Sequence, residues 1–291
     1  MYKLVVIDLD GTMLNQYGSI TENTKEVIKK VQEKGIEVVI ASGRPLDSSK
    51  NFAKEIKSER YVISGNGAII YDFTNDKIIY ENTLKKSKVL EIIKICEENS
   101  IFYNIYTENE IITKNLQYNV LYYHKENSNK EENEKTHINI VEDIYDYIAK
   151  REERIIKITI CDNYQTIFNS ILRKIREIDD IEVLDVSHMS KKVITNGIED
   201  IDVEYFYTEI SAKNVDKWNA IEFLAEKINV SKEEIVAIGD NINDKKMIEN
   251  SGIGIAMGQS TPVIKEIANY ITTSNFEEGV AKALEKEILG N

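Results

Sequence analysis

Two aspartates stand one residue apart near the N-terminus, directly after an apolar run. Residues 4–7 read as a buried strand, and the chain continues with Asp8, Leu9, Asp10, Gly11 and Thr12. Such a strand delivers both carboxylates to the edge of a sheet, and the glycine then lets the chain turn sharply away. Because two neighbouring acids repel each other, this placement favours a bound cation or a chemical use.

A second acidic strand end lies far downstream. Residues 235–238 form another short apolar run, which ends in Gly239, Asp240, Asn241, Ile242, Asn243 and Asp244. Magnesium prefers oxygen ligands such as carboxylates and commonly binds substrate phosphates as well. Together, the two strand ends predict a magnesium site built for phosphoryl chemistry.

The first pair of aspartates fits a two-step phosphoryl transfer. Phosphate monoesters hydrolyse so slowly that enzymes accelerate the reaction up to ~10²¹-fold, which is roughly 28 kcal/mol of barrier. A carboxylate nucleophile divides this reaction into two easier steps through an aspartyl phosphate. Asp8 is the expected nucleophile, because the first residue past a buried strand is the most rigidly held. Asp10 is the expected general acid and base, which protonates the leaving oxygen and then activates water.

An anionic nucleophile that faces an anionic phosphate needs positive charge nearby. Two unit charges ~4 Å apart interact by about 4 kcal/mol at an effective dielectric of about 20. Mg²⁺ would offset this repulsion, with Asp8, Asp240, the Asp10 carbonyl and, directly or through water, Asp244 as ligands. Lys217 would neutralise phosphoryl oxygens, and the Ser42 hydroxyl with the Gly43 N–H would hold another oxygen.

Strand and helix patterns alternate around these motifs. A helix is predicted from Thr21 to Gly35, followed by short apolar strands over residues 38–41 and 61–63. This alternation is typical of an α/β fold with an open, mostly parallel sheet and helices on both faces. Ligands of such sheets bind at the carboxyl ends of the strands, where the polar residues named above stand.

The middle of the chain reads as a separate α+β module inserted into the sheet domain. Residues 84–207 contain amphipathic helices and alternating strands, and the polar run 125–135 is interpreted as a solvated loop or exposed helix turn. Five tyrosines of this module either face a substrate or pack against neighbours, and packing is favoured: Tyr103, Tyr106, Tyr118, Tyr122 and Tyr123.

Composition argues against several classes of partner. A formal net charge of −13 disfavours nucleic acids and anionic membranes, since both need a basic surface. Cys96 and Cys161 lack a CxxC spacing and are expected to be buried thiols in a reducing compartment. No ligand spacing connects the histidines, which are expected at the surface: His124, His137 and His188. Because no apolar run approaches a ~20-residue membrane span and the first strand starts at once, we expect a cytoplasmic protein without a signal peptide.

The motifs resemble those of the haloacid dehalogenase superfamily, in particular its Cof-type phosphatases with a type IIB cap. Four family motifs occur in order: DLDGTML at Asp8, ASGRP around Ser42, VDKWNAI at Lys217 and GDNIND at Asp240. Shorter family-like pieces are ISGNGAIIYD around Asn66, GIGIAMG near Met257 and TTSNFEEGVAKAL near the C-terminus. The middle of the chain matches only in position and size.

This resemblance implies a Rossmann-like catalytic core of residues 1–82 and 208–291. Residues 83–207 would form an α+β cap that closes over the active site and selects the substrate. Asp8 would be the nucleophile and Asp10 the acid and base, with Mg²⁺ held by Asp8, Asp10 and Asp240. The predicted phosphate-binding residues are Leu9, Ser42, Gly43, Lys217 and Asn243, and the candidate substrate contacts are Arg44 and Asn66.

Three features depart from the family pattern. Lys213 stands four residues before Lys217 and competes for its role, although the apolar spacing favours Lys217. Ser42 replaces the commoner threonine but keeps the hydroxyl. Residues 190–204 are longer and more acidic than expected before the third motif, which leaves the second cap boundary open.

The predicted function is Mg²⁺-dependent hydrolysis of phosphate monoesters of small metabolites, such as sugar phosphates or nucleotide-like cofactors. Two alternatives stay open. A phosphotransferase or phosphomutase would use the same aspartyl phosphate, and a non-catalytic regulatory protein would use the scaffold alone, although no essential carboxylate is missing. Neither the natural substrate nor the oligomeric state follows from the sequence.

Overall fold

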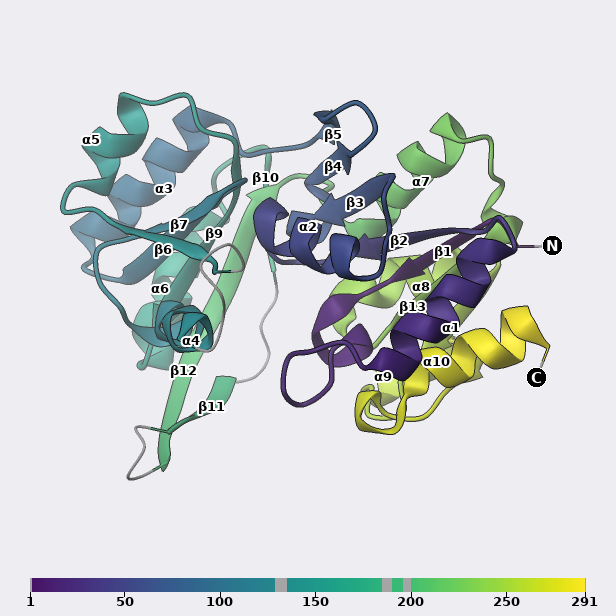
Figure 1. Cartoon of the computed structure of the whole chain (residues 1–291). Helices are drawn as coiled ribbons and strands as arrows, with labels where there is room; N and C mark the ends of the chain where they lie inside the picture. The colour runs from purple at the N-terminus through teal and green to yellow at the C-terminus, as the bar shows by residue number, and fades with distance from the viewer. Residues whose placement is uncertain (1, 129–134, 185–189, 196–199, 291) are drawn as a thin grey trace. The chain divides into compact units, whose positions relative to one another are not determined.

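The structure is a computed structural model that describes residues 2–128, 135–184, 190–195 and 200–290 (Figure 1). The chain divides into two compact units. The first consists of Met1–Glu81 and Val215–Asn291, and the second is Asn82–Asn214. The first unit is therefore assembled from two segments that flank the second in sequence.

A mostly parallel sheet forms the centre of the first unit. Its strands are Leu4–Ile7 (β1), Glu37–Ala41 (β2), Tyr61–Ser64 (β3), Ile69–Asp72 (β4), Lys77–Glu81 (β5), Ile235–Gly239 (β13), Ile253–Ala256 (β14) and Tyr270–Ile271 (β15). They follow the order β15-β14-β13-β1-β2-β3-β4-β5. Neighbours from β15 to β3 run parallel, whereas β4 and β5 add antiparallel pairs at one edge. The predicted fold class is confirmed.

β1 lies inside the sheet because it is apolar on both faces. Every residue of β1 and β13 is buried. Ile7, the last residue of β1, pairs with Ile238 of β13 and with Ile40 of β2. A strand that is buried on both faces reads as a continuous apolar run, which is the pattern that predicted it. The residues that follow β1, β2 and β13 therefore meet at one edge of the sheet.

The helices of the first unit begin and end at recognisable signals. Their bounds are Glu22–Glu33 (α1), Leu46–Glu55 (α2), Lys217–Lys227 (α7), Lys245–Asn250 (α8), Pro262–Ile267 (α9) and Gly279–Leu284 (α10). Before α1, the Thr21 side chain accepts a hydrogen bond from the N–H three residues on, and Gly35 follows the end of the helix with a φ of 78°. Lys217 begins α7, as predicted, and the Asp216 side chain caps that helix.

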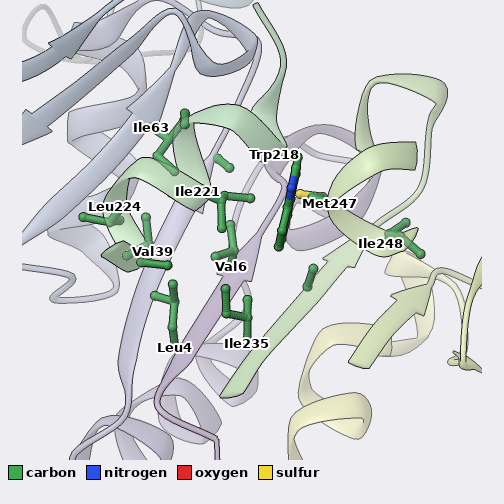
Figure 2. Close-up of a cluster of buried hydrophobic side chains, with 14 of the residues drawn as sticks. Leu4, Val6, Val39, Ile63, Trp218, Ile221, Leu224, Ile235, Met247 and Ile248 are labelled. Atoms are coloured by element: carbon green, nitrogen blue, oxygen red, sulfur yellow. The ribbon is translucent and has the colours of Figure 1, made fainter. Parts of the chain in front are cut away.

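One face of the sheet buries an apolar cluster under α7 and α8 (Figure 2). Figure 2 shows Ile221 of α7 over Val6 of β1, and the Trp218 ring beside Met247 of α8. Burying one such side chain stabilises a fold by about 1.5–3 kcal/mol. The cluster thereby fixes α7 against the sheet and sets the position of Lys217 at its first turn.

The second unit is an α+β module, which agrees with the predicted fold class. Its strands are Phe102–Thr107 (β6), Glu110–Thr113 (β7), His137–Ile140 (β8), Ile155–Asp162 (β9), Ile181–Val183 (β10), Ser190–Thr195 (β11) and Asp200–Ala212 (β12). The sheet order is β10-β12-β9-β6-β7-β8, and β11 pairs with β12. β7 and β8 run parallel, and the other described pairs run antiparallel. The helices are Lys86–Glu98 (α3), Tyr118–Asn127 (α4), Ile144–Ala149 (α5) and Gln165–Ile175 (α6).

The second junction between the units differs from the expected boundary at residue 207. β12 continues without a break to Ala212, and it pairs with β9 as far as Ser211. Residues 208–212 therefore belong to the sheet of the inserted unit, which ends at Asn214. Within the acidic stretch before the third motif, residues 190–195 form β11 and residues 200–204 begin β12. Sequence pattern alone does not show where β12 stops.

Several expectations about single residues can be compared with this structure. Both cysteines are buried, as predicted. His124 and His137 are exposed, which agrees with the surface position expected for them. His188 and residues 129–134 of the polar run lie outside the described residues.

Packing accounts for most of the five tyrosines in the inserted unit. Tyr103 and Tyr106 are buried, and the rings of Tyr106 and Tyr123 lie 6.1 Å apart between centroids. Tyr118 contacts two other aromatic rings. Tyr122 is the most exposed of the five at 43%, although its ring lies edge-on to that of Tyr123 at 5.9 Å between centroids.

Candidate active site

The acidic turn after β1 is held close to the end of β13. The Asp8 N–H donates to the Ile238 carbonyl at 3.0 Å. The chain then passes through Leu9–Met13, a short π-helical turn whose middle residues leave helical geometry. Gly11 has a φ of 82°, and a Cβ at this position would lie 2.5 Å from Asp240 Oδ2. Glycine is thus required both by the backbone conformation and by the approach of the second acidic strand end.

Three of the predicted metal-binding carboxylates gather at this edge. Asp8, Asp240 and Asp244 each place one oxygen within 4.8 Å of the others. Asp244 is fully buried, and its Oδ2 accepts the N–H groups of Asp240 and Asn241 at 3.0 and 3.1 Å. A Cβ at Gly239 would lie 2.5 Å from Asp244 Cβ, so that the turn after β13 folds back tightly onto the strand end.

Lys217 completes the cluster from the first turn of α7. Its Nζ lies 2.5 Å from Asp8 Oδ1 and 2.6 Å from Asp244 Oδ1, and its side chain is fully buried. Burial alone would lower the pKa of Lys217, but the carboxylates of Asp244 and Asp8 raise it above the usual value, so the ammonium stays charged. The competing Lys213 is exposed and belongs to the inserted unit.

The cluster carries more negative than positive charge. Burial, and then repulsion by Asp244, raise the pKa of Asp8 well above its usual range. Burial and Asp244 likewise raise the pKa of Asp240 to about 6, although the Thr12 hydroxyl, which donates to Asp240 Oδ1 at 3.0 Å, acts in the opposite direction. When all three carboxylates are ionised, Lys217 leaves two negative charges uncompensated. Oxygen ligands with this charge suit a divalent cation such as Mg²⁺.

Asp10 is held in a two-point ion pair with Arg44. Arg44 Nε donates to Asp10 Oδ2 at 2.8 Å, and Arg44 Nη2 donates to Asp10 Oδ1 at 2.6 Å. The Arg44 side chain is only 5% exposed, whereas that of Asp10 is 55% exposed. Arg44 was expected as a substrate contact, and the structure gives its guanidinium a protein carboxylate as partner. This fork geometry fixes the direction of the Asp10 side chain.

A second group of predicted residues gathers at the ends of β2 and β3. Ser42 is fully buried, and its Oγ accepts the Arg44 N–H at 3.1 Å. A Cβ at Gly43 would lie 2.7 Å from Asn66 Oδ1, and Asn243 Nδ2 donates to that same oxygen at 3.0 Å. Asn66 thus joins two predicted phosphate-binding residues, a role that the sequence did not suggest.

Other residues at the site were not predicted. The Thr12 hydroxyl donates to Asp240. The position of Thr12 in the DxDGT motif was a signal that could have predicted this contact. Gln259 and Asn275 donate hydrogen bonds to the carbonyls of Gly11 and Leu14. Their only signal in the sequence was position: Asn275 lies inside a family-like segment, and Gln259 directly follows another. Leu9, a predicted phosphate-binding residue, is fully buried, and its carbonyl accepts the N–H at the end of the turn at 2.9 Å.

Comparison with known proteins places this chain in a family. A family model described as haloacid dehalogenase-like hydrolase matches residues 5–284. The chain belongs to the haloacid dehalogenase-like hydrolase family. The superfamily and the hydrolase class predicted from the four motifs are therefore confirmed.

Relatives of this haloacid dehalogenase-like hydrolase match it over almost its whole length. It is 27% identical to 5-amino-6-(5-phospho-D-ribitylamino)uracil phosphatase YcsE of Bacillus subtilis, over 99% of this chain and 96% of the relative. A solved haloacid dehalogenase-like hydrolase of Bacteroides thetaiotaomicron is 29% identical, with a TM-score of 0.81 over 98% of this chain and 99% of that one. A sugar phosphatase of subclass IIB, 22% identical with a TM-score of 0.74 over 98% of both chains, shares the fold.

The described helices of this haloacid dehalogenase-like hydrolase include no candidate membrane span. None of its described helices combines the length and the apolar character that a membrane span requires.

Proposed function

We propose that this protein is a Mg²⁺-dependent phosphatase that hydrolyses phosphate monoesters of small metabolites through an aspartyl phosphate on Asp8. The observation that carries this proposal is the buried cluster in which Lys217 contacts Asp8 and Asp244 beside Asp240. A structural ion pair would need only one acid for one lysine. Three acids around one lysine are an arrangement for binding a cation and a phosphoryl group.

Asp8 is suited to attack phosphorus. Its carboxylate lies at the end of a fully buried strand, where the Ile238 carbonyl accepts its backbone N–H. Lys217 holds one carboxylate oxygen, which leaves the other oxygen to act as the nucleophile. Asp8, Asp240 and Asp244, with the Asp10 carbonyl, would hold Mg²⁺, which supplies the positive charge that lets an anionic nucleophile approach an anionic phosphate.

Asp10 is suited to proton transfer. With both oxygens accepting from Arg44, Asp10 is in the carboxylate form that takes a proton from the water attacking the aspartyl phosphate. To act as the acid in the first step, it would first bind a proton on one oxygen and release the Arg44 bond at that oxygen, and it would then pass this proton to the leaving oxygen. Its exposed side chain can reach substrate and water, while Arg44 prevents it from turning away. Positioning of this kind contributes to the rate because the proton donor must already lie in the right direction.

The phosphoryl oxygens would be held by groups at the ends of β2 and β13. The Ser42 hydroxyl, the Gly43 N–H and the Asn243 amide supply hydrogen bonds, while Lys217 supplies charge. Asn66 Oδ1 accepts from the Asn243 amide and lies so close to Gly43 that a side chain there would meet it, which brings these donors together.

The proposed substrates are sugar phosphates or nucleotide-like phosphates. Two similar proteins support this class, since one is named as a phosphatase of a phosphoribitylamino-uracil and another as a sugar phosphatase. In this proposal the inserted unit, residues 82–214, acts as the cap that selects the substrate.

The test is phosphate release from p-nitrophenyl phosphate and from a panel of sugar and nucleotide phosphates. The wild-type protein should release phosphate in the presence of Mg²⁺, and the release should stop when EDTA is added. Asp8→Asn should be inactive, because an amide cannot form the acyl phosphate. Asp146→Asn is the matched control, since Asp146 lies on α5 of the inserted unit in an exposed ion pair with Lys150.

Three outcomes would count against the proposal: equal turnover of wild type and Asp8→Asn, turnover that survives EDTA, or no turnover on any member of the panel. Addition of a second sugar, followed by ³¹P NMR, separates hydrolysis from transfer. Phosphate released to water supports a phosphatase, and a new sugar phosphate formed faster supports a phosphotransferase.

A further inference from the structure

Two side-chain amides from the C-terminal segment contact the turn that carries Asp10. Gln259 Nε2 donates to the Gly11 carbonyl, and Asn275 Nδ2 donates to the Leu14 carbonyl at 2.7 Å. The Asn275 N–H in turn donates to Gln259 Oε1 at 3.3 Å. Gln259 and Asn275 are therefore connected through this backbone N–H into one bridge, which holds the turn at its middle and at its end.

This turn needs support from outside. Inside Leu9–Met13, Asp10 has φ −76° and ψ 117°, and Gly11 has φ 82° and ψ −3°, so neither residue has helical geometry. A glycine in such a position leaves the backbone many alternatives, because it tolerates both signs of φ. The bond from Gln259 holds the carbonyl of Gly11, which belongs to the peptide group between Gly11 and Thr12. Only the two backbone torsions of Gly11 then separate this anchored peptide group from the one that carries the Asp10 carbonyl.

The bridge rests on a rigid base. Gln259 directly follows Gly258, whose N–H donates to the Thr273 carbonyl at 3.0 Å. Asn275 begins a short 3₁₀ turn that Ser274 and Glu277 close as a capping box. Amides that are anchored in this way can impose a position on the loop they contact, whereas freely moving side chains could not.

We propose that Gln259 and Asn275 are positioning residues for Asp10, which set its backbone carbonyl for metal binding and its carboxylate for proton transfer. This inference rests on the proposed function of Asp10. A misplacement of about 1 Å can cost about 100-fold in rate. Loss of the bridge should therefore lower kcat by about 10- to 100-fold and leave KM almost unchanged, because neither amide contacts the proposed phosphate-binding group.

The experiment replaces each amide by the acid of the same shape. Asn275→Asp loses the donor to the Leu14 carbonyl, and Gln259→Glu loses the donor to the Gly11 carbonyl. Asn250→Asp is the matched control, because Asn250 Nδ2 also donates to a backbone carbonyl, that of Lys246, at 2.8 Å. The measurements are kcat and KM on p-nitrophenyl phosphate, the thermal midpoint, and the Kd of Mg²⁺ alone by calorimetry.

We expect both variants to show the fall in kcat, an unchanged KM and a Kd for Mg²⁺ that is weaker by about 10-fold, as for loss of other groups that orient metal ligands. Because the amides form one bridge, the double variant should lose little more than either single variant. Asn250→Asp should match wild type in every measurement.

Wild-type kcat and Kd in both variants would overturn the positioning role, as would a rise in KM with kcat unchanged. Failure of the proposed function gives a different result, namely an inactive wild type. The calorimetric Kd alone then decides, since a displaced Asp10 carbonyl weakens Mg²⁺ binding whatever the reaction is. If Asn275→Asp does not fold, Gln259→Glu tests the same bridge from an exposed position.

Discussion

Asp240→Asn is expected to stabilise the metal-free protein while it abolishes Mg²⁺-dependent turnover. Asp240 places an oxygen within 4.8 Å of oxygens on Asp8 and Asp244, and Lys217 contacts those two acids instead of Asp240. Asparagine has the same shape and can still accept the hydrogen bond from the Thr12 hydroxyl. The substitution therefore removes repulsion, a half-buried charge and a proposed metal ligand, and little else.

Two arguments that share the repulsion by Asp244 give the size of the effect. Two charges separated by 4.8 Å repel each other by about 3 kcal/mol at an effective dielectric of about 20. Burial and Asp244 raise the pKa of Asp240 from 3.8 to about 6, and a shift of about two pKa units corresponds to about 3 kcal/mol. Because Asp240 keeps some contact with water, we expect a gain of about 1–3 kcal/mol in the free energy of unfolding at pH 8.

The effect has a defined dependence on pH. The pKa of Asp240 is about 6 in the folded protein and near 3.8 in the unfolded chain, so the folded state binds this proton more tightly. The stability that protonation contributes is complete below about pH 4 and is lost as the pH rises through about 6. Asp240→Asn should therefore exceed wild type by the full amount at pH 8 and by little at pH 4.

Urea unfolding in EDTA measures both the gain in the free energy of unfolding and its dependence on pH. The single tryptophan, Trp218, lies in the core of the first unit and reports on its unfolding through fluorescence. Comparing variant and wild type at each pH cancels the contribution of the other carboxylates to the free energy of unfolding. Asp244→Asn is the opposite case, because it breaks a buried pair with Lys217 and should destabilise by about 3–5 kcal/mol. A loss of stability in Asp240→Asn at pH 8, or an equal gain at pH 4 and pH 8, would refute the reasoning.

Three further outcomes follow from single contacts. Arg44→Lys should lower kcat on p-nitrophenyl phosphate by about 10- to 100-fold with KM nearly constant, because an ammonium cannot hold both Asp10 oxygens; a rise in KM alone would indicate a substrate contact instead. Gly11→Ala should cost about 1–3 kcal/mol in thermal or urea unfolding and weaken Mg²⁺ binding, since its Cβ would meet the Asp240 carboxylate at a φ of 82°; an unchanged unfolding curve would contradict the geometry. Burial raises the pKa of the Cys96 thiol, so Ellman's reagent at pH 8 should label this thiol only after unfolding; rapid labelling of the native protein would disagree.

The sequence predicted the central sheet and the acidic cluster because both depend on local pattern. β1 and β13 are short and built mainly from apolar residues, and an aspartate directly follows the last residue of each strand. Parallel strands then bring their carboxyl ends to one edge, which is enough to place Asp8 near Asp240. Lys217 was distinguished from Lys213 by the apolar spacing of α7, since only Lys217 begins the face that packs on the sheet.

Contacts between distant side chains could not be predicted in this way. Arg44 and Asp10 are 34 positions apart, and Asn275 is 261 positions from Leu14. Whether such groups meet depends on how α2 and the C-terminal segment pack, which no local pattern records. The cap boundary expected at residue 207 falls before the end of β12 for a related reason, because pairing with β9 and not the composition of the strand decides where β12 ends.

The split construction of the first unit has a consequence for protein synthesis. β1 is made early, but its partner β13 and the residues Lys217 and Asp240 follow the whole inserted unit. A ribosome that has released only the first 214 residues therefore presents Asp8 without the lysine or the second acidic strand end. The inserted unit, which is continuous in sequence, can build its sheet while the other unit waits. Nascent and truncated chains should consequently be chemically silent, and catalysis should begin only when the polypeptide is nearly finished.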